Sequence, residues 1–479
     1  MFVPRTDEHA VNLLPPYFDP DYVEHVVKPF MSASIITGER PSLPMIDTTL
    51  TKEKAIPPHI YGMLYEKWMP ELDGEGLSVF LQGYENRGPE NERKRIYYSA
   101  FTADLYRTRY QSKIVAFLDN LFTVENSGKP LMQTYYDSYF DLYWDLHLGV
   151  SGDEIPAEVR EIGKAFNTVI GFWFPTLDAV YHSYTKVRSL RSFLRDWVDA
   201  RVEDILQRRT PDYDKTIVHA WIQNGSFEEN FRRKDIVFEC FHNFLAFSQW
   251  GNTIFNIVQR LSEKDGDAAT KDWFVRTMSD PDRLDGSPFT SLACYTMELF
   301  RIISPNGGSY SLSPARQSLS GQGYNGVTTL HQTSSMNPLH WPDADVFNPE
   351  RYRNVPLTSD HDASAAKAAG LQACPFAKTA RSLRDGREGQ VENSVYGAVY
   401  ATVDGITVPV PDTAGYAPFG FGYRRCAGEL LTIGFVEDFL RKVHKSGIGF
   451  TTLPTEHPTK LPVGPGTVID DHYTFRLNR

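Results

Sequence analysis

Apolar residues recur at helical spacing in several long segments of this chain, and a sheet-dominated fold does not accommodate them. They repeat every third or fourth position in residues 92–122, 187–207 and 233–262, which is the period of one helical face. Residues 288–303 (PFTSLACYTMELFRII) predict a buried helix, and LLTIGFVEDFLRKVHK, after Gly428, predicts another. The chain is therefore predicted to be mainly α.

Strand-like alternation of apolar and polar residues is confined to short pieces near 308–333, 395–410 and 467–477, which predict a small β-rich part. Residues 354–413 are rich in Ala, Ser, Asp and Gly, and we interpret them as an insertion or long loop. No Ser/Gly-rich linker, charge block or repeat divides the chain. We therefore expect residues 1–479 to form a single domain.

Charge and cysteine content exclude several classes of protein. The net charge of -11 argues against a nucleic-acid partner, because phosphate binding needs concentrated Lys and Arg. The first thirty residues lack both a basic start and a continuous apolar stretch, so we expect no signal peptide and no membrane anchor. Four cysteines without a CxxC pair favour a soluble, cytoplasmic protein over a zinc or disulfide scaffold: Cys240, Cys294, Cys374 and Cys426.

One cysteine lies in a glycine-rich segment, YAPFGFGYRRCAGE (416–429). Its glycines allow a tight turn and a close approach to a flat ligand. Cys426 comes just before an apolar helix, whose free N–H groups favour a thiolate. Phe419 would pack beside the sulfur, and the planar fork of Arg424 can reach an acidic edge of a cofactor. A thiolate on haem iron promotes O–O bond cleavage.

This segment resembles the cysteine-ligand loop FGxGxRxCxG of the cytochrome P-450 family, and every fixed position is matched from Phe419 to Gly428. The resemblance implies a cytochrome P-450-like fold and a haem b cofactor (iron protoporphyrin IX), with Cys426 as the ligand of the metal. It also places Gly420 and Arg424 beside the haem. The activity implied is that of an oxidoreductase, in most members a monooxygenase.

Two further motifs appear in the chain order of that family. Glu298 and Arg301 form ExxR within the predicted helix 288–303, and the run FNPER (347–351) resembles the family's FxPER segment. The resemblance implies that Glu298, Arg301 and Arg351 form a buried charged triad behind the haem. An ExxR pair alone is typical of a solvated helix surface.

Weaker matches concern cations for the haem propionates. Arg316 follows the ExxR helix and resembles the family's arginine in its inner strand. Arg95 matches the arginine of the family's HxxxR motif, although Asn91 stands where that motif has histidine. Both are also explained as ordinary surface arginines.

The predicted helix 233–262 departs from the family's distal pattern, (A/G)Gx(D/E)T, whose acid and Thr support proton delivery to bound oxygen. One register puts Gln249 at the acid and Trp250 at the Thr. A shift of three residues puts Asn252 and Thr253 there. Neither register supplies a carboxylate, and an amide cannot ionise. Trp250 or Phe247 in place of a small residue would also crowd the space for oxygen.

Three functions follow from these residues. The first is a haem-thiolate enzyme that acts on a small apolar organic substrate without a reductase. It would use peroxide, or rearrange or dehydrate a substrate with an O–O or N–O bond, as the allene oxide synthases of that family do. The alternatives are a conventional monooxygenase that uses dioxygen and a redox partner, and a non-catalytic haem sensor. The tyrosine-rich stretch 131–150 is expected to pack under the distal helix.

A redox partner would be a separate ferredoxin or reductase, because the chain contains no flavin or ferredoxin region. Basic residues near the cysteine could form its docking patch. The same residues could instead compensate the helix dipole and pair with propionates. They are Arg424, Arg425, Arg441, Lys442 and Lys445.

Overall fold

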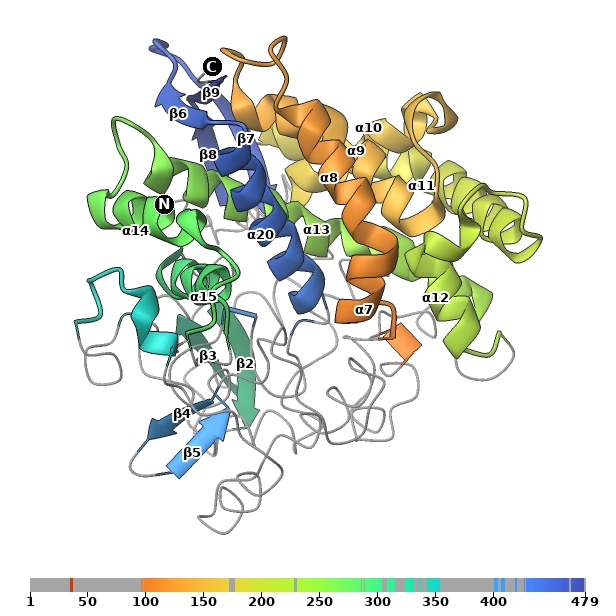
Figure 1. Cartoon of the computed structure of the whole chain (residues 1–479). Helices are drawn as coiled ribbons and strands as arrows, with labels where there is room; N and C mark the ends of the chain where they lie inside the picture. The colour runs from red at the N-terminus through yellow and green to blue at the C-terminus, as the bar shows by residue number, and fades with distance from the viewer. Residues whose placement is uncertain are drawn as a thin grey trace.

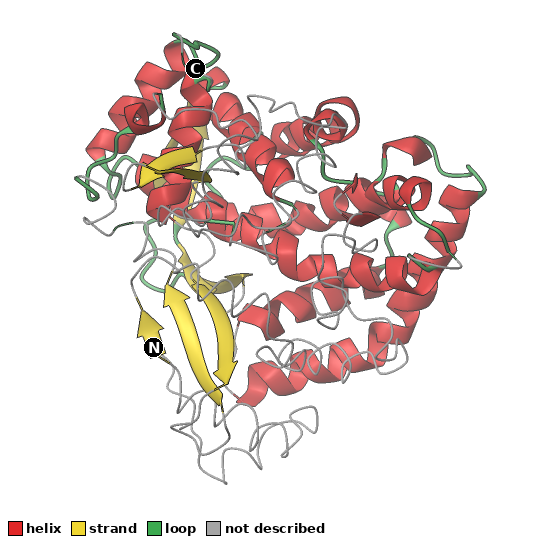
Figure 2. Ribbon diagram, turned by 90° about the horizontal axis from the view of Figure 1, so that it is seen from below, coloured by secondary structure: helices red, strands yellow, loops and turns green. Residues whose placement is uncertain are grey.

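The computed structural model describes the chain from residue 35 to residue 477 with gaps. The described residues are 35–37, 96–97, 99–171, 177–227, 231–285, 287, 289–303, 308–314, 324–330, 336, 343–353, 400–403, 406–409, 418–419, 426, 428–464 and 467–477. Helices form most of this part and the strands gather to one side of it (Figures 1 and 2). The fold is mainly α with a small β-rich part, as predicted.

The first half of the described chain is helical. Its helices are α7 (Ala103–Leu105), a π-helix (Tyr106–Tyr110), α8 (Gln111–Leu121), α9 (Leu131–Leu148), α10 (Ala157–Gly171), α11 (Leu177–Leu206) and α12 (Ile217–Asn224). Short 3-10 turns cover Gly152–Glu154 and Tyr213–Lys215. The periodic segment 92–122 is therefore divided, because a turn at 100–102 and the π-helix interrupt it.

The second half supplies the helices that carry the candidate site. They are α13 (Arg233–Leu261), α14 (Ala268–Ser279), α15 (Ser291–Ile303), the 3-10 helix Pro349–Tyr352 and α20 (Glu429–Lys445). The start of α13 is fixed by Asp235, which accepts a hydrogen bond from the backbone N–H of Arg232 at 2.9 Å. Arg233 then clamps α13 to α11 through Asp199 and Glu203, at 2.6 and 2.5 Å.

The strands form four small sheets. β1 (Ile35–Thr37) pairs parallel with β3 (Tyr324–Leu330), which pairs antiparallel with β2 (Gly308–Pro314). Three antiparallel pairs join β4 (Tyr400–Val403) to β5 (Ile406–Pro409), β6 (Ile448–Thr452) to β9 (Tyr473–Leu477), and β7 (Thr459–Gly464) to β8 (Thr467–Asp471). Strands occur in all three predicted regions. Most of the predicted loop 354–413 lies outside the described residues, but β4 and β5 fall within it.

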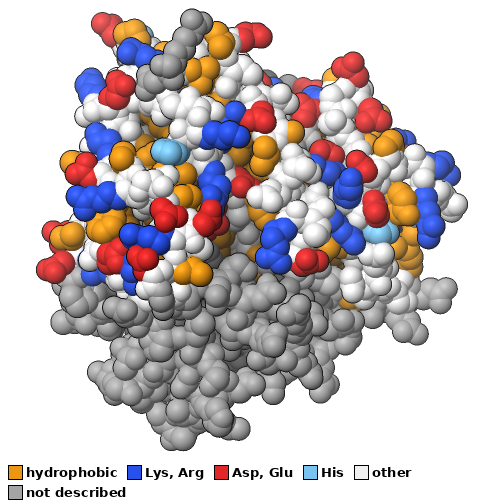
Figure 3. All heavy atoms as spheres, viewed as in Figure 1, with side chains coloured by type: hydrophobic (Ala, Val, Ile, Leu, Met, Phe, Trp, Pro, Cys, Tyr) orange, Lys and Arg blue, Asp and Glu red, His pale blue; other side chains and the backbone are white. Residues whose placement is uncertain are grey.

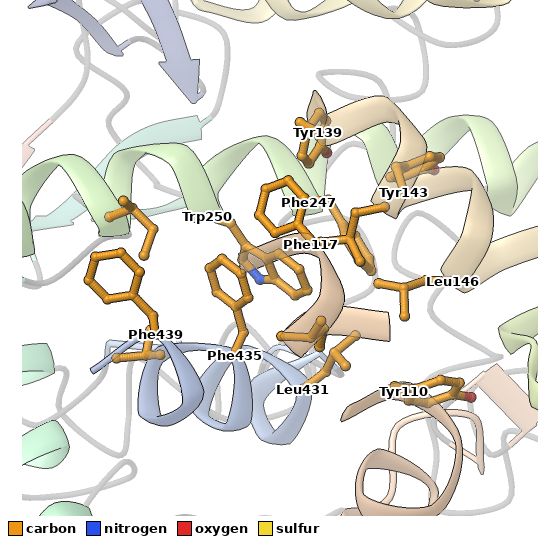
Figure 4. Close-up of a cluster of buried hydrophobic side chains, with 14 of the residues drawn as sticks. Tyr110, Phe117, Tyr139, Tyr143, Leu146, Phe247, Trp250, Leu431, Phe435 and Phe439 are labelled. Atoms are coloured by element: carbon orange, nitrogen blue, oxygen red, sulfur yellow. The ribbon is translucent and has the colours of Figure 1, made fainter. Parts of the chain in front are cut away.

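Aromatic side chains fill the core between α8, α9, α13 and α20 (Figure 4). Phe122, at the end of α8, packs against Phe439 of α20 and Phe475 of β9, with ring centroids 5.7 and 5.0 Å apart. Full burial of each such ring contributes about 2–3 kcal/mol to folding. Within the described residues, no helix combines the length and apolar character needed to cross a bilayer.

The first turn of α9 is capped from a distant part of the chain. Pro130 precedes the helix and supplies no side-chain cap. The carboxylate of Asp471, at the end of β8, instead accepts the backbone N–H groups of Met132 and Gln133 at 3.1 and 2.8 Å. Two otherwise unsatisfied N–H groups are thereby paired. Burial raises the pKa of Asp471, while these two bonds act against that rise.

Candidate functional site

Cys426 lies at the entrance to α20, in a loop that closes on itself. Its backbone N–H donates to the carbonyl of Phe419 at 2.8 Å. The Phe419 ring packs on Phe300 of α15, with centroids 4.9 Å apart. Residues 420–425 lie outside the described residues, and with them the candidates Gly420 and Arg424. The loop is thus held at both ends, by α15 at Phe419 and by α20 after Gly428.

The surroundings of Cys426 suit a metal-binding thiolate better than those of the other described cysteines. Cys240 and Cys294 are buried, and burial raises the pKa of Cys240 well above its ordinary value and that of Cys294 to about 12. Cys426 is only partly buried and comes just before the N-terminus of α20. Among the described residues, a Cβ built on Gly428 would meet the Cys426 sulfur, at 3.8 Å. The residues present therefore fit a flat ligand held by sulfur.

Glu298 and Arg301 form a fully buried ion pair on α15. The guanidinium of Arg301 donates to both carboxylate oxygens of Glu298, at 2.8 Å each. Arg351 reaches the same carboxylate with its Nε at 3.3 Å. The structure thus brings the three predicted residues together, with both Glu298 and Arg301 at 0% exposure.

Sequence reasoning missed two further groups that complete this cluster. The Tyr352 hydroxyl and the backbone N–H of Asn348 donate to Glu298 at 3.0 and 2.9 Å. Arg301 also donates to the carbonyl of Ala344 at 2.8 Å. The two fully buried charges, Glu298 and Arg301, are therefore paired and hydrogen-bonded, which is the condition under which buried ions are tolerated. Because α15 also carries Phe300, the cluster fixes the helix that supports the cysteine loop.

Trp250 points from α13 into the core and toward α20 (Figure 4). Its indole N–H donates to the Thr432 hydroxyl at 2.9 Å, and its ring stacks on Phe435 with centroids 4.3 Å apart. Trp250 is 3% exposed. Trp250 fills the space between α13 and α20 next to Thr432, which lies six residues after Cys426. Its first role is therefore packing.

Gln249 and Asn252 face a different neighbour. A Cβ built on Gly464 of β7 would lie 3.6 Å from Gln249 Cγ and 3.8 Å from Asn252 Cβ. The Thr253 hydroxyl donates to the Gln249 carbonyl at 3.0 Å, so its proton is used within the helix. The four candidate residues of α13 thus do not share one face, because successive helical residues point in different directions.

The middle of α13 offers no group that can exchange a proton near neutral pH. Residues 243–259 contain no ionisable side chain. The polar side chains in this stretch include the amides of Gln249, Asn252 and Asn256. The amide of Asn256 donates to the Asn252 side chain at 2.8 Å. The lack of a carboxylate therefore applies to several turns of α13 and not only to the two positions compared with the family pattern.

The tyrosine-rich stretch 131–150 forms α9 and packs against α13, as predicted. The Tyr136 hydroxyl donates to the Ser248 carbonyl at 3.1 Å, and the Tyr143 hydroxyl donates to the Cys240 carbonyl. A Cβ on Gly251 would lie 2.0 Å from the Tyr136 oxygen. Any side chain at position 251 would therefore have to displace the Tyr136 ring.

A buried histidine, which sequence reasoning missed, connects α9 with α13. His147 Nδ1 lies 2.8 Å from the Tyr143 carbonyl and therefore carries the proton. Its Nε2 then accepts the Asn243 amide at 2.9 Å, and the Tyr97 hydroxyl donates to the Asn243 oxygen. Burial lowers the pKa of His147 to about 3. Its ring is therefore neutral throughout the physiological range.

His147→Gln is expected to make the protein less sensitive to acid. The folded-state pKa of about 3 lies below the unfolded value of 6.5. Below pH 6.5 the unfolded chain therefore binds a proton that the native state does not bind. The free energy of unfolding consequently decreases as the pH falls below 6.5. Between pH 6.5 and about 4 the loss amounts to roughly 3 kcal/mol.

Urea unfolding of both proteins at these two pH values measures this effect. The variant is expected to be less stable at neutral pH, because it loses hydrogen bonds, yet to lose less stability on acidification. An equal acid-dependent loss in the two proteins would contradict the assignment of His147.

The predicted basic patch is partly neutralised. Arg441 pairs with Asp282 at 2.5 Å and Lys442 with Asp119 at 2.6 Å. Arg424 and Arg425 lie outside the described residues, as do the propionate candidates Arg95 and Arg316. On the face shown in Figure 3, basic and acidic side chains are interspersed over the described part.

Comparison with known proteins gives similarity at the level of structure. No protein-family profile and no curated protein sequence matches the chain. The retinoic acid-bound cyanobacterial CYP120A1 matches with a TM-score of 0.57 and 14% identity, covering 98% of this chain and 96% of that one. The haem domain of cytochrome P-450DA matches with a TM-score of 0.53 and 14% identity, over 93% and 87% of the two chains. The chain has the cytochrome P-450 fold, which confirms the predicted fold.

Proposed function

We propose that this protein is a haem-thiolate enzyme that holds its iron through Cys426 and acts on a small apolar organic substrate. The observation that carries the proposal is the closed loop from Phe419 to Cys426 at the start of α20, supported by the buried Glu298 cluster. Haem b bound there would supply an iron whose thiolate ligand favours O–O bond cleavage.

The protein's own residues hold and shield this site. Phe419, fixed on Phe300, limits the access of water to the Cys426 sulfur. The N-terminus of α20 favours the thiolate form of that sulfur. Arg95, Arg316 and Arg424 are the proposed partners of the propionates, since planar guanidinium groups bind carboxylates with two hydrogen bonds.

We further propose that turnover needs no reductase. Reductive activation of dioxygen needs protons delivered to the site, and residues 243–259 supply no ionisable group. The Thr253 hydroxyl donates its hydrogen bond to the Gln249 carbonyl, and His147 is neutral. Peroxide, or a substrate with its own O–O or N–O bond, brings the bond to be cleaved and needs less proton transfer. Pairing of Arg441 and Lys442 with acids also weakens the case for an acidic partner there.

The route is tested with two parallel reactions on the haem-loaded protein. One receives ferredoxin, reductase and NADPH, and the other receives hydrogen peroxide or a peroxidised substrate. Product is expected from the second without NADPH. Tight coupling of NADPH consumption to product in the first, with no product in the second, would instead establish a conventional monooxygenase. In that case Thr253 or water would carry the proton.

A further inference from the structure

Five aromatic rings in contact lead from α13 to the surface of α11. Trp250 contacts Phe247 with ring centroids 4.7 Å apart, and Phe247 contacts Tyr143 at 5.3 Å. Tyr143 contacts Trp144, and Trp144 contacts Trp197, each at 4.9 Å. No step in this row, which we call the tryptophan row, leaves a gap between rings. Electron tunnelling falls exponentially with distance, so ring contact of this kind is what a multistep electron path requires.

The three tryptophans are the residues of the row suited to hold an oxidising equivalent. Phenylalanine is too hard to oxidise. A tyrosine must give up its proton when it is oxidised, and the Tyr143 hydroxyl faces the Cys240 carbonyl, which is not a base. An indole can lose an electron and keep its proton for a time. Phe247 and Tyr143 therefore act as packing that joins Trp250 to Trp144.

The inner end of the row lies close to the candidate site. Trp250 is hydrogen-bonded to Thr432 in the first turns of α20, the helix that begins three residues after Cys426. Figure 4 shows Trp250 between α13 and α20, with Phe247 and Tyr143 continuing away from α20. The tryptophan row therefore starts at the contact between α13 and α20, the helix that follows Cys426.

The outer end reaches solvent beside an apolar side chain. Trp197, on α11, is only partly buried. Phe193, one turn earlier on the same helix, is 42% exposed. Residues four apart lie on one helical face, so the two rings together offer a contact surface for an aromatic molecule.

We propose that the protein has a second activity, the one-electron oxidation of phenolic donors at Trp197, with electrons passing inward through Trp144 to Trp250. This activity rests on the proposed haem site and peroxide route. Two phenols each give up one electron and one proton and become phenoxyl radicals. One hydrogen peroxide takes up both electrons and both protons, its O–O bond breaks, and two waters form.

Such a path also suits an enzyme without a reductase. Peroxide that arrives when no apolar substrate is bound would leave two oxidising equivalents in the protein, and no reductase would supply the electrons to remove them. Electrons drawn from external phenols through the tryptophan row would remove these oxidising equivalents. The protein interior is thereby spared oxidation.

The test uses the haem-loaded protein, hydrogen peroxide and a phenol attached to a polymer too large to enter the fold. Trp197→Phe is expected to lower the rate of phenol oxidation by an order of magnitude or more. Trp273→Phe is the matched control, since Trp273 is also partly buried but lies on α14 under Arg276. That variant is expected to keep the wild-type rate.

A second readout locates the radical itself. After peroxide treatment with a spin trap, mass spectrometry is expected to find the adduct on Trp197 in the wild type and to lose it in Trp144→Phe. A wild-type rate in Trp197→Phe, or no adduct at Trp197 in the wild type, would overturn the electron path. Absence of the thiolate-haem spectrum from the wild-type protein would be a different result, because it would overturn the proposed function as well.

Discussion

Cys426→Ser is expected to abolish the red-shifted Soret band of the reduced, carbon monoxide-bound protein. Only a thiolate ligand to the iron gives that shift, and a serine hydroxyl is too weak an acid to replace it. The loss is expected to be complete, because Cys426 is the one described cysteine that lies at the start of α20 and is only partly buried. The measurement is a difference spectrum of the purified protein, with total haem b determined separately.

Cys294→Ala provides the control. Cys294 is a buried side chain on α15, and burial keeps its thiol protonated by raising its pKa to about 12. This variant is expected to keep the red-shifted band. If Cys426→Ser kept the band as well, the ligand would be a different cysteine and the proposed site would be wrong.

Glu298→Ala is expected to have the largest effect on stability. It leaves Arg301 charged at 0% exposure, and it removes an acceptor that Arg351, Tyr352 and the Asn348 amide share. Leaving a buried charge without its partner costs about 3–5 kcal/mol. Chemical unfolding and the yield of haem-loaded protein measure the effect, and we expect little loaded protein.

Glu350→Ala is the matched control for this cluster. Glu350 lies in the same segment and pairs with Arg353 at 2.7 Å, but its side chain is 42% exposed. Exposed pairs contribute at most about 1 kcal/mol. Equal stability of Glu298→Ala and Glu350→Ala would show that the buried cluster is not what holds α15 in place.

Long helices with one apolar face could be predicted from the sequence. The segments 233–262 and 288–303 correspond to α13 and α15, within a few residues at each end. The segment 92–122 shows the limit of this reasoning. Its apolar spacing continues through Tyr106–Tyr110, where the backbone forms a π-helix instead. Apolar spacing reports which face is buried and does not report how tightly each turn is wound.

The strands β6 and β7 were not predicted, and the reason differs between them: β6 pairs with β9 across the intervening strands β7 and β8, whereas β7 has an interrupted alternation. Phe450 of β6 lies opposite Phe475 of β9. β7 contains Pro462 and a register irregularity before Gly464, so its alternation is broken. A strand whose partner is not its neighbour in sequence, or whose alternation is interrupted, leaves a weak local signal.

The candidate site was predictable where motifs fix spacing and not where orientation matters. The meeting of Glu298 with Arg301 follows from one helical turn. The direction of Trp250 depends on how α13 is rotated against α20, and the sequence leaves two registers open. The Tyr97–Asn243–His147 connection joins separate elements, so no local pattern indicates it.

The cap on α9 has a consequence for how the protein is made. Asp471 stands 338 and 339 positions beyond the N–H groups that it pairs, and Phe475 accepts the Gly128 N–H at 3.2 Å just before the same helix. A ribosome therefore releases α9 long before it delivers β8 and β9. Until then the first turn of α9 is free to fray, and its buried tyrosines are open to wrong partners. The nascent chain is thus expected to depend on chaperones until its last strands emerge.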